Sequence, residues 1–333
     1  MPTRKPSYFL VSLSNKTNLN LCMKYSLAGF TNSISGVWTF LEIREGDFIS
    51  FLYGAKAFNL YTVTKKEALR NAESLPPWSL ITFRVSGRTY YFPFRLDLNP
   101  VRKLEESLVR PEFSYVAENL LLRGGYRRTH FQADQTTLQN VSQMGNLWGE
   151  RVEKLELRDY ETLVPKFIRN RKFVSPPEIF PLQELILQAL IRQYLTEESG
   201  LSKFLELVEV DELDAKSLEV LGEKALPEGH IDILIKEAVP IGISRKIIVE
   251  VKIGRGSERD LEQLEKYVEE LGSEVVRGVL VAREFPRGVI YKLLMRRNQN
   301  LKAIKYSLKD FSLDGSYTFE QLREKFEFQR VST

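Results

Sequence analysis

The first half of the chain carries short apolar segments separated by turns, a pattern typical of β-strands. Four such segments predict strands, at residues 7–12, 48–53, 80–85 and 89–94. The last two flank Ser86-Gly87-Arg88, which predicts a β-hairpin. Helical periodicity appears at 64–74 and at 100–108. Together these patterns indicate a small, β-rich α+β domain.

Beyond residue 180 the periodicity changes to an alternation of helices and strands. Apolar residues recur at helical spacing over 181–195, with Pro181 expected in the first turn, and Ser257 is expected to cap a helix over 257–271. A further helix is expected at 287–297. The predicted strands are 217–221, 231–235, 246–253 and 275–282. This order predicts an α/β domain with a partly parallel sheet.

A basic segment lies between the two patterns. It breaks at Ser175-Pro176-Pro177, where two prolines disfavour regular structure. We therefore expect a first domain over residues 1–165, a basic linker over 166–180 and a second domain over 181–333. A chain of 333 residues is long enough for two hydrophobic cores.

Charge is divided unevenly between these parts, although the whole chain carries only +4. Residues 1–165 hold 21 Lys and Arg against 16 Asp and Glu, and residues 166–180 hold four against one. The remainder holds 23 basic against 27 acidic residues. The first part therefore favours contact with a polyanion, whereas the second concentrates carboxylates. A difference of this size also occurs between unrelated protein surfaces, so charge alone decides nothing.

Cysteine and histidine are too scarce for several kinds of site. Cys22 is the only cysteine and the chain has two histidines, which excludes intrachain disulfides, zinc–thiolate clusters and multi-histidine metal sites. A bound metal would need carboxylate and carbonyl oxygens, which favours Mg²⁺ or Mn²⁺. No apolar run reaches the roughly 18 residues of a membrane span, and the N-terminus lacks a signal-peptide pattern. We expect a cytoplasmic protein without a membrane partner.

The most specific motif is Gly229-His230-Ile231-Asp232 followed by Val249-Glu250-Val251-Lys252. Side chains alternate along a strand, so Glu250 and Lys252 share one face. If the two strands pair through residues 236–245, Asp232 meets Glu250 there. Two carboxylates could bind Mg²⁺, and Lys252 could polarise or deprotonate an attacking water and stabilise phosphorane charge. The alternative is an ordinary edge strand with a solvent-facing Glu-Val-Lys triplet.

This arrangement resembles the PD-(D/E)XK nuclease superfamily. Gln263 and Tyr267, four residues apart on the next predicted helix, look like the Gln-x-x-x-Tyr element of several branches. Over residues 181–312 the sequence looks most like the C-terminal domain of NucS-type endonucleases. The resemblance implies that Glu184 completes the metal site of Asp232 and Glu250, with Glu197 or Glu198 as alternatives. It also implies that Gln263 orients the site or a phosphate.

The first domain is rich in aromatic residues, most of which we expect in its core. Ser35-Gly36-Val37-Trp38-Thr39 places a tryptophan after what reads as a flexible turn, and it resembles the Gly-Val-Trp element of YTH domains. With residues 46–54, the domain is similar to EVE/YTH-like members of the PUA superfamily, including reader domains of archaeal McrB subunits. The resemblance implies a pocket for a modified base, formed by Trp38, Trp78 and Tyr53. For each of the three, a core position is the alternative.

A second basic segment, residues 123–130 (RGGYRRTH), combines arginines with a tyrosine. Arg123, Arg127 and Arg128 could contact the phosphates of a nucleic-acid backbone, or the segment could be a solvated loop. The linker residues Arg169, Arg171 and Lys172 could extend this contact.

Together these features predict a modification-dependent DNA endonuclease. Its first domain would flip and cage a methylated base in double-stranded DNA, with 6-methyladenine favoured by the YTH resemblance. Its second domain would hydrolyse phosphodiesters with Mg²⁺, and a homodimer could cut both strands. One alternative is a NucS-like repair endonuclease that acts on mismatched, branched or single-stranded DNA. Another is a non-catalytic protein that binds RNA or DNA.

Overall fold

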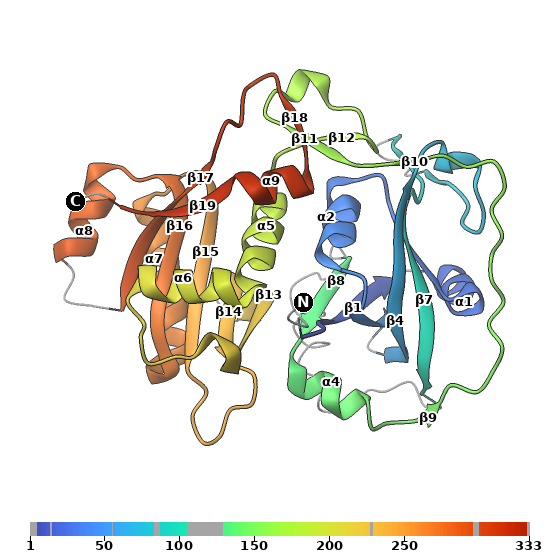
Figure 1. Cartoon of the computed structure of the whole chain (residues 1–333), viewed down its shortest axis with the longest axis horizontal. Helices are drawn as coiled ribbons and strands as arrows, with labels where there is room; N and C mark the ends of the chain where they lie inside the picture. The colour runs from blue at the N-terminus through green and yellow to red at the C-terminus, as the bar shows by residue number, and fades with distance from the viewer. Residues whose placement is uncertain are drawn as a thin grey trace. The chain divides into compact units, whose positions relative to one another are not determined.

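The chain forms two compact, sheet-rich units, Lys5–Pro181 and Leu182–Thr333. The computed structural model is drawn in Figure 1 and describes residues 5–13, 15–54, 56–82, 87–104, 129–226, 229–295 and 300–331. In none of these ranges is a helix both long and apolar enough to cross a membrane.

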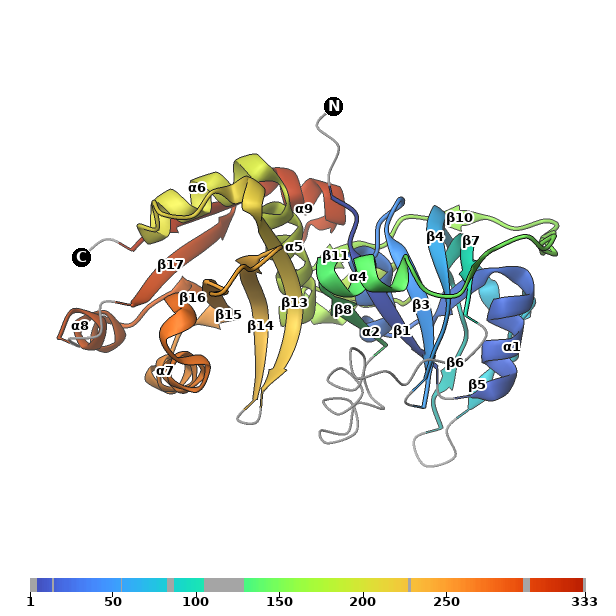
Figure 2. The same cartoon turned by 90° about the horizontal axis from the view of Figure 1, so that it is seen from below.

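The first unit is built on a mixed sheet whose main strands follow the order β2-β7-β4-β3-β1-β8. β1 and β3 run parallel, and the other neighbours along this path run antiparallel. The strands are β1 (Tyr8–Leu13), β2 (Leu27–Phe30), β3 (Phe48–Tyr53), β4 (Lys56–Leu69), β7 (Phe94–Lys103) and β8 (His130–Ala133), with β9 (Asn146–Leu147) and β10 (Thr162–Leu163) at the sides. The helices are α1 (Lys16–Tyr25), α2 (Ile34–Glu42) and α4 (Gln135–Val141). Figures 1 and 2 show α1 and α2 on opposite sides of β4 and β7.

The predicted strands at 7–12 and 48–53 are confirmed as β1 and β3. The predicted hairpin is present only in part: β5 (Ile81–Thr82) pairs antiparallel with β6 (Thr89–Tyr90), whereas residues 91–93 lie in no strand and Phe94 begins β7. The predicted helices are wrong where the structure describes them. Residues 64–69 belong to β4, followed by a 3₁₀ turn at Ala72–Ser74, and residues 100–103 belong to β7.

The wrong helix at 64–74 has a clear physical cause. Its Lys, Glu, Ala and Leu residues favour a helix locally. In the fold, β4 pairs with β3 on one side and β7 on the other, so that Glu67 lies opposite Arg95 and Lys65 opposite Asp97. Long-range pairing thus overrides local propensity.

The segment expected to be a linker is folded into the first unit. β11 (Lys166–Ile168) pairs in parallel with β12 (Ile179–Pro181), and a 3₁₀ turn at Arg171–Phe173 lies between them. Phe167 and Phe180 are buried, and Phe180 packs against Phe94. Pro181 therefore ends a strand, and the next helix begins only at Glu184.

The second unit is an α/β fold around a six-stranded sheet of order β13-β14-β15-β16-β17-β19. β15, β16 and β17 run parallel, which confirms the predicted partly parallel sheet. The strands are β13 (Leu218–Leu226), β14 (Gly229–Glu237), β15 (Lys246–Arg255), β16 (Val275–Glu284), β17 (Leu301–Leu308) and β19 (Phe326–Arg330), with a short β18 at Ser316–Thr318. The helices are α5 (Glu184–Thr196), α6 (Glu198–Val208), α7 (Glu258–Leu271), α8 (Arg287–Met295) and α9 (Phe319–Lys325).

Helices cover both faces of this sheet. Figure 2 shows α5 and α6 on one side and α7 and α8 on the other. The apolar side of α7 packs on β15 and β16 through Leu261, Leu264 and Val268, which are all buried. Ser257 caps α7 as predicted. The contact is close because β16 has a glycine there: a Cβ on Gly278 would lie 2.8 Å from Val268 and from Leu301.

Replacing this glycine should loosen α7. We expect Gly278→Ala to lower the free energy of unfolding by about 1–3 kcal/mol, because the added methyl group overpacks the interface. Gly254→Ala, on the neighbouring strand where a Cβ would meet nothing within 4 Å, is the matched control. Urea unfolding measures both, and equal stability of the two variants would contradict the proposed packing constraint.

Candidate active site

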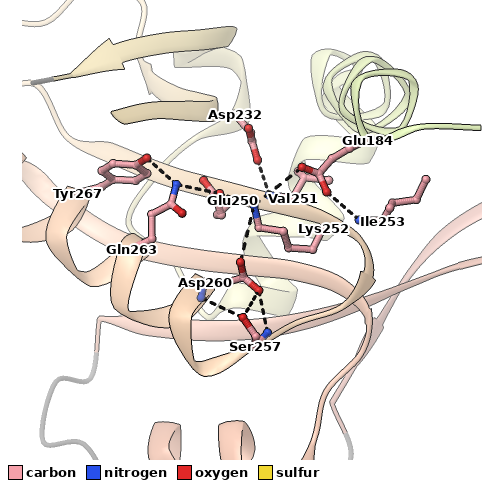
Figure 3. A network of polar contacts seen from close by, with 10 residues as sticks. All are labelled: Glu184, Asp232, Glu250, Val251, Lys252, Ile253, Ser257, Asp260, Gln263 and Tyr267. Atoms are coloured by element: carbon pink, nitrogen blue, oxygen red, sulfur yellow. Dashed lines mark hydrogen bonds and ion pairs between the residues drawn. The ribbon is translucent and has the colours of Figure 1, made fainter. Parts of the chain in front are cut away.

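Two carboxylates meet where β14 and β15 pair. The strands run antiparallel, with Ile233 opposite Val249, so Asp232 and Glu250 follow on the two strands and share one face. Asp232 Oδ2 accepts a hydrogen bond of 2.7 Å from the backbone N–H of Val251 (Figure 3). The hairpin thus brings together the Asp and the Glu-x-Lys motif that were predicted from the sequence.

Glu250 is buried at the centre of this group, with 1% of its surface exposed. Its Oε1 accepts hydrogen bonds from Lys252 Nζ at 2.8 Å and from Gln263 Nε2 at 3.3 Å. Its other oxygen, Oε2, has no hydrogen-bond partner among the described residues. A buried carboxylate oxygen without a partner is costly, so this atom calls for a ligand.

Burial makes the charged form of both carboxylates costly in this setting. Burial, and then the nearby charge of Glu250, raise the pKa of Asp232 well above its usual value, although the Val251 N–H partly opposes them. Burial also raises the pKa of Glu250, and the charge and hydrogen bond of Lys252 only partly offset it. Two like charges at one buried site favour any added positive charge.

Lys252 supplies the positive charge that the site already contains. Burial alone would lower its pKa, but the charge and hydrogen bond of Glu250, followed by the charges of Asp232 and Glu184, raise it above the usual value. The amine is therefore an ammonium at neutral pH, which suits charge stabilisation rather than proton abstraction.

Glu184 reaches the same group from α5. It is the first residue of that helix, and its Oε2 accepts a hydrogen bond of 3.2 Å from the backbone N–H of Ile253. Its Oε1 lies 3.8 Å from Lys252 Nζ. The alternatives point elsewhere, because Glu197 pairs with Arg323 and Glu198 with Lys216. The structure therefore brings Glu184, rather than either alternative, to Asp232 and Glu250.

Gln263 and Tyr267 lie on one face of α7, as their spacing predicts. Gln263 Nε2 donates to Tyr267 Oη at 2.6 Å as well as to Glu250. Tyr267 is buried, so its ring fixes the position of the amide. The pair links α7 directly to the central carboxylate.

Asp260 also belongs to this group, although the sequence analysis did not predict it. Its Oδ2 accepts hydrogen bonds from Ser257 N–H at 2.8 Å and Ser257 Oγ at 2.6 Å, which forms a capping box at the start of α7. Its Oδ1 lies 3.8 Å from Lys252 Nζ. The Ser-x-x-Asp spacing was visible in the sequence, but only the fold places this cap beside the lysine.

The donor set fits a hard divalent cation in part. Glu184, Asp232 and Glu250 offer only oxygen donors, and Glu250 Oε2 is a buried oxygen with no partner among the described residues. Within those residues, no group of three or more His, Cys, Asp or Glu side chains is already arranged to hold a metal ion. A cation would thus draw the carboxylates away from some of their present hydrogen bonds.

The aromatic residues proposed for base binding lie in the first unit and are mostly packed. Trp38 is not on a flexible turn but inside α2, which Ser33 caps. Gly36 is needed for close packing, because a Cβ there would lie 1.8 Å from the Thr31 carbonyl oxygen. The Trp38 ring is 4.3 Å from that of His130, and its indole N–H has no hydrogen-bond partner in the described ranges.

Trp78 and Tyr53 have different surroundings. Trp78 is buried against Phe92 and fills the place that a side chain on Gly29 would need, as a core residue does. Tyr53 ends β3 opposite Lys56 and is half-buried. No ring contact joins either to Trp38 in the part of the chain that the structure describes.

The basic residues proposed for backbone contact are only partly described. Arg123, Arg127 and Arg128 lie outside the described residues. Arg169, Arg171 and Lys172 are exposed near β11.

Residues 202–314 match the family described as the Endonuclease NucS C-terminal domain. The second unit is therefore similar to the C-terminal domain of NucS endonucleases over these residues. No curated protein matches the chain.

Solved structures resemble either about a third of the chain or nearly all of it. One is an EndoMS–dsDNA2 complex, with 24% identity over 33% of this chain and 44% of that chain and a TM-score of 0.23. Another is a repair endonuclease from Pyrococcus abyssi, with 19% identity over 32% and 45% and a TM-score of 0.23. A third is the DNA modification-dependent restriction endonuclease AspBHI, with 13% identity over 97% and 71% and a TM-score of 0.21. The chain spans less than half the length of the first two.

Because burial and the charge of Glu250 make the ionised form of Asp232 costly, we expect a variant without this charge to be more stable than the parent. Because the pKa of Asp232 is raised on folding, its contribution to stability is present below the unfolded value of 3.8 and is lost as pH rises through the folded pKa. Asp232→Asn cannot ionise, so it avoids this loss of stability, and its amide oxygen can still accept the hydrogen bond of the Val251 N–H. In EDTA at pH 8 we expect its Tm to rise by about 2–4 °C, the shift for roughly 1 kcal/mol.

The gain should shrink as the pH is lowered toward 4, where the parent carboxyl keeps its proton. Asp211→Asn, which removes an exposed carboxylate of the same unit, is the control and should leave Tm nearly unchanged. A Tm for Asp232→Asn at or below that of the parent at pH 8 would show that the site tolerates both charges.

Proposed function

We propose that this protein is a metal-dependent endodeoxyribonuclease whose active site consists of Glu184, Asp232, Glu250 and Lys252. The observation that carries the proposal is the buried Glu250, with one oxygen bonded to Lys252 and the other without a partner among the described residues, in a domain of NucS type. A structural ion pair would need no second acidic neighbour, whereas a phosphodiesterase site needs acidic oxygens and a cation together.

Each residue has a defined part in this proposal. Glu184, Asp232 and Glu250 would hold Mg²⁺ or Mn²⁺ through carboxylate oxygens. When bound, the ion would lower the pKa of a water and neutralise charge on the phosphate. Lys252, as an ammonium, would stabilise the negative charge that develops on the phosphate oxygens. Gln263, held by Tyr267, would orient Glu250 or a phosphate.

Removing the ammonium tests the catalytic assignment. We expect Lys252→Ala to lower kcat by at least about 100-fold, the scale for losing one transition-state donor, with the Kd for duplex DNA changed little. Lys266→Ala, an exposed position on α7, is the control. Cleavage should require Mg²⁺ or Mn²⁺ and stop in EDTA. A Lys252→Ala protein that cleaves as fast as the parent would exclude the proposed site.

We further propose that the first unit directs the nuclease to a methylated base in double-stranded DNA, with 6-methyladenine favoured. Support comes from the EVE/YTH-like sequence and from Trp38, a buried ring beside His130 whose indole N–H has no partner among the described residues. Such a donor fits a base whose ring nitrogen or carbonyl accepts a hydrogen bond. Trp78 and Tyr53 would then contribute less than Trp38.

Selective cleavage of methylated duplexes tests this reading. Trp38→Phe keeps a buried ring but removes the indole N–H, so we expect the preference for a 6-methyladenine duplex over a plain one to fall about ten-fold, the worth of one lost polar contact. Trp148→Phe, whose indole bonds the Glu150 carbonyl, is the control. Equal cleavage of methylated and plain duplexes by the parent protein would contradict the proposed dependence on base modification.

The second candidate is a NucS-like repair endonuclease for mismatched, branched or single-stranded DNA. The family match over residues 202–314 favours it, because the match concerns the nuclease unit and names a NucS domain. Including mismatched and branched duplexes in the same cleavage experiment separates the two candidates.

A further inference from the structure

The chain leaves regular strand pairing immediately after Lys252. β15 pairs with β16 from Ile247 to Lys252, where Lys252 lies opposite Ala282, and the next pair is Arg255 opposite Glu284. Two residues of β15, Ile253 and Gly254, thus face a single residue of β16. This is a β-bulge, a feature that re-aims side chains next to active sites.

Side chains replace the missing strand contacts at this bulge. The Ile253 N–H donates to Glu184 Oε2 at 3.2 Å, and the Ile253 carbonyl accepts from Tyr306 Oη at 2.7 Å. Two residues earlier, on the other side of Lys252, the Val251 N–H donates to Asp232 Oδ2. The backbone on both sides of Lys252 is therefore held by three side chains from three different elements.

Tyr306 differs from the other two because it is not a carboxylate. Asp232 and Glu184 are candidate ligands of a cation, so their oxygens would be shared between the backbone and that ion. The phenol has no such second task in the proposed site. Its ring is buried in β17 and lies parallel to Phe326, at 6.2 Å and 18°, so the hydroxyl has a fixed position.

We propose that Tyr306 is a positioning residue of the nuclease site: by bonding the Ile253 carbonyl it fixes the bulge and thereby the ammonium of Lys252. This inference rests on the proposed nuclease function. The phenol reaches β15 from β17, past the intervening strand β16. Small displacements of a catalytic group are costly, and a shift near 1 Å can lower the rate by about 100-fold.

Tyr306→Phe is the direct test, because it removes one hydroxyl and keeps the ring. We expect kcat for duplex cleavage to fall about ten-fold or more, while KM and the Kd for DNA stay within about two-fold. The matched control is Tyr194→Phe. Tyr194 also packs on Phe326, edge-on rather than stacked, and its hydroxyl takes no part in the proposed contact.

A second measurement does not depend on activity. Amide hydrogen exchange of Ile253, whose N–H donates to Glu184, reports on opening of the bulge and can be followed by NMR in EDTA. We expect Tyr306→Phe to lower its protection about ten-fold relative to the parent and to Tyr194→Phe. A purely structural role would instead lower Tm and the protection of the whole core together.

Each outcome is decisive for one of the two ideas. If Tyr306→Phe matches Tyr194→Phe in kcat and in Ile253 exchange, the positioning role is overturned. It is also overturned if the loss of kcat disappears when both variants are compared at equal distance below their Tm. If the parent cleaves no DNA with Mg²⁺ or Mn²⁺, the nuclease function fails, and the exchange data still decide whether Tyr306 holds the bulge.

Discussion

The second unit depends on one unfavourable arrangement, two carboxylates held together in a poorly solvated place. Burial and the charge of Glu250 raise the pKa of Asp232, burial raises the pKa of Glu250, and the ammonium of Lys252 partly offsets both shifts. Such a site persists only because the antiparallel register of β14 and β15 enforces it. The surrounding packing, from the first residue of α5 to the capped start of α7, stabilises this arrangement.

The sequence predicted this unit well because its signals are local. Alternation along β15, the Ser257 cap and the four-residue spacing of Gln263 and Tyr267 need no knowledge of distant contacts. Asp260 and Tyr306 could not be predicted in the same way. The role of each depends on which strand or helix start comes beside Lys252, and that is settled only by the sheet order and the bulge.

The first unit was harder to predict because its strands take their conformation from long-range pairing. Residues 64–69 have helical propensity and still form a strand between β3 and β7. At Trp38 the prediction failed in the other direction, because a turn was expected and a helix is present. Gly36 does not make a flexible turn there but lets α2 pack closely on Thr31. What this unit recognises stays a prediction. If the proposed functions hold, a reader joined to a nuclease would raise the effective concentration of DNA at the carboxylates proposed for catalysis.

The capping box of α7 has a consequence for how catalysis could fail without global unfolding. Asp260 ties the first turn of the helix to Lys252, and the next turn carries the amide that bonds Glu250. Fraying at a helix end costs far less than opening a core. Unwinding of these two turns would therefore remove the contact of Asp260 with Lys252 and that of Gln263 with Glu250 together, so the site could lose its α7 contacts at a temperature below that of global unfolding.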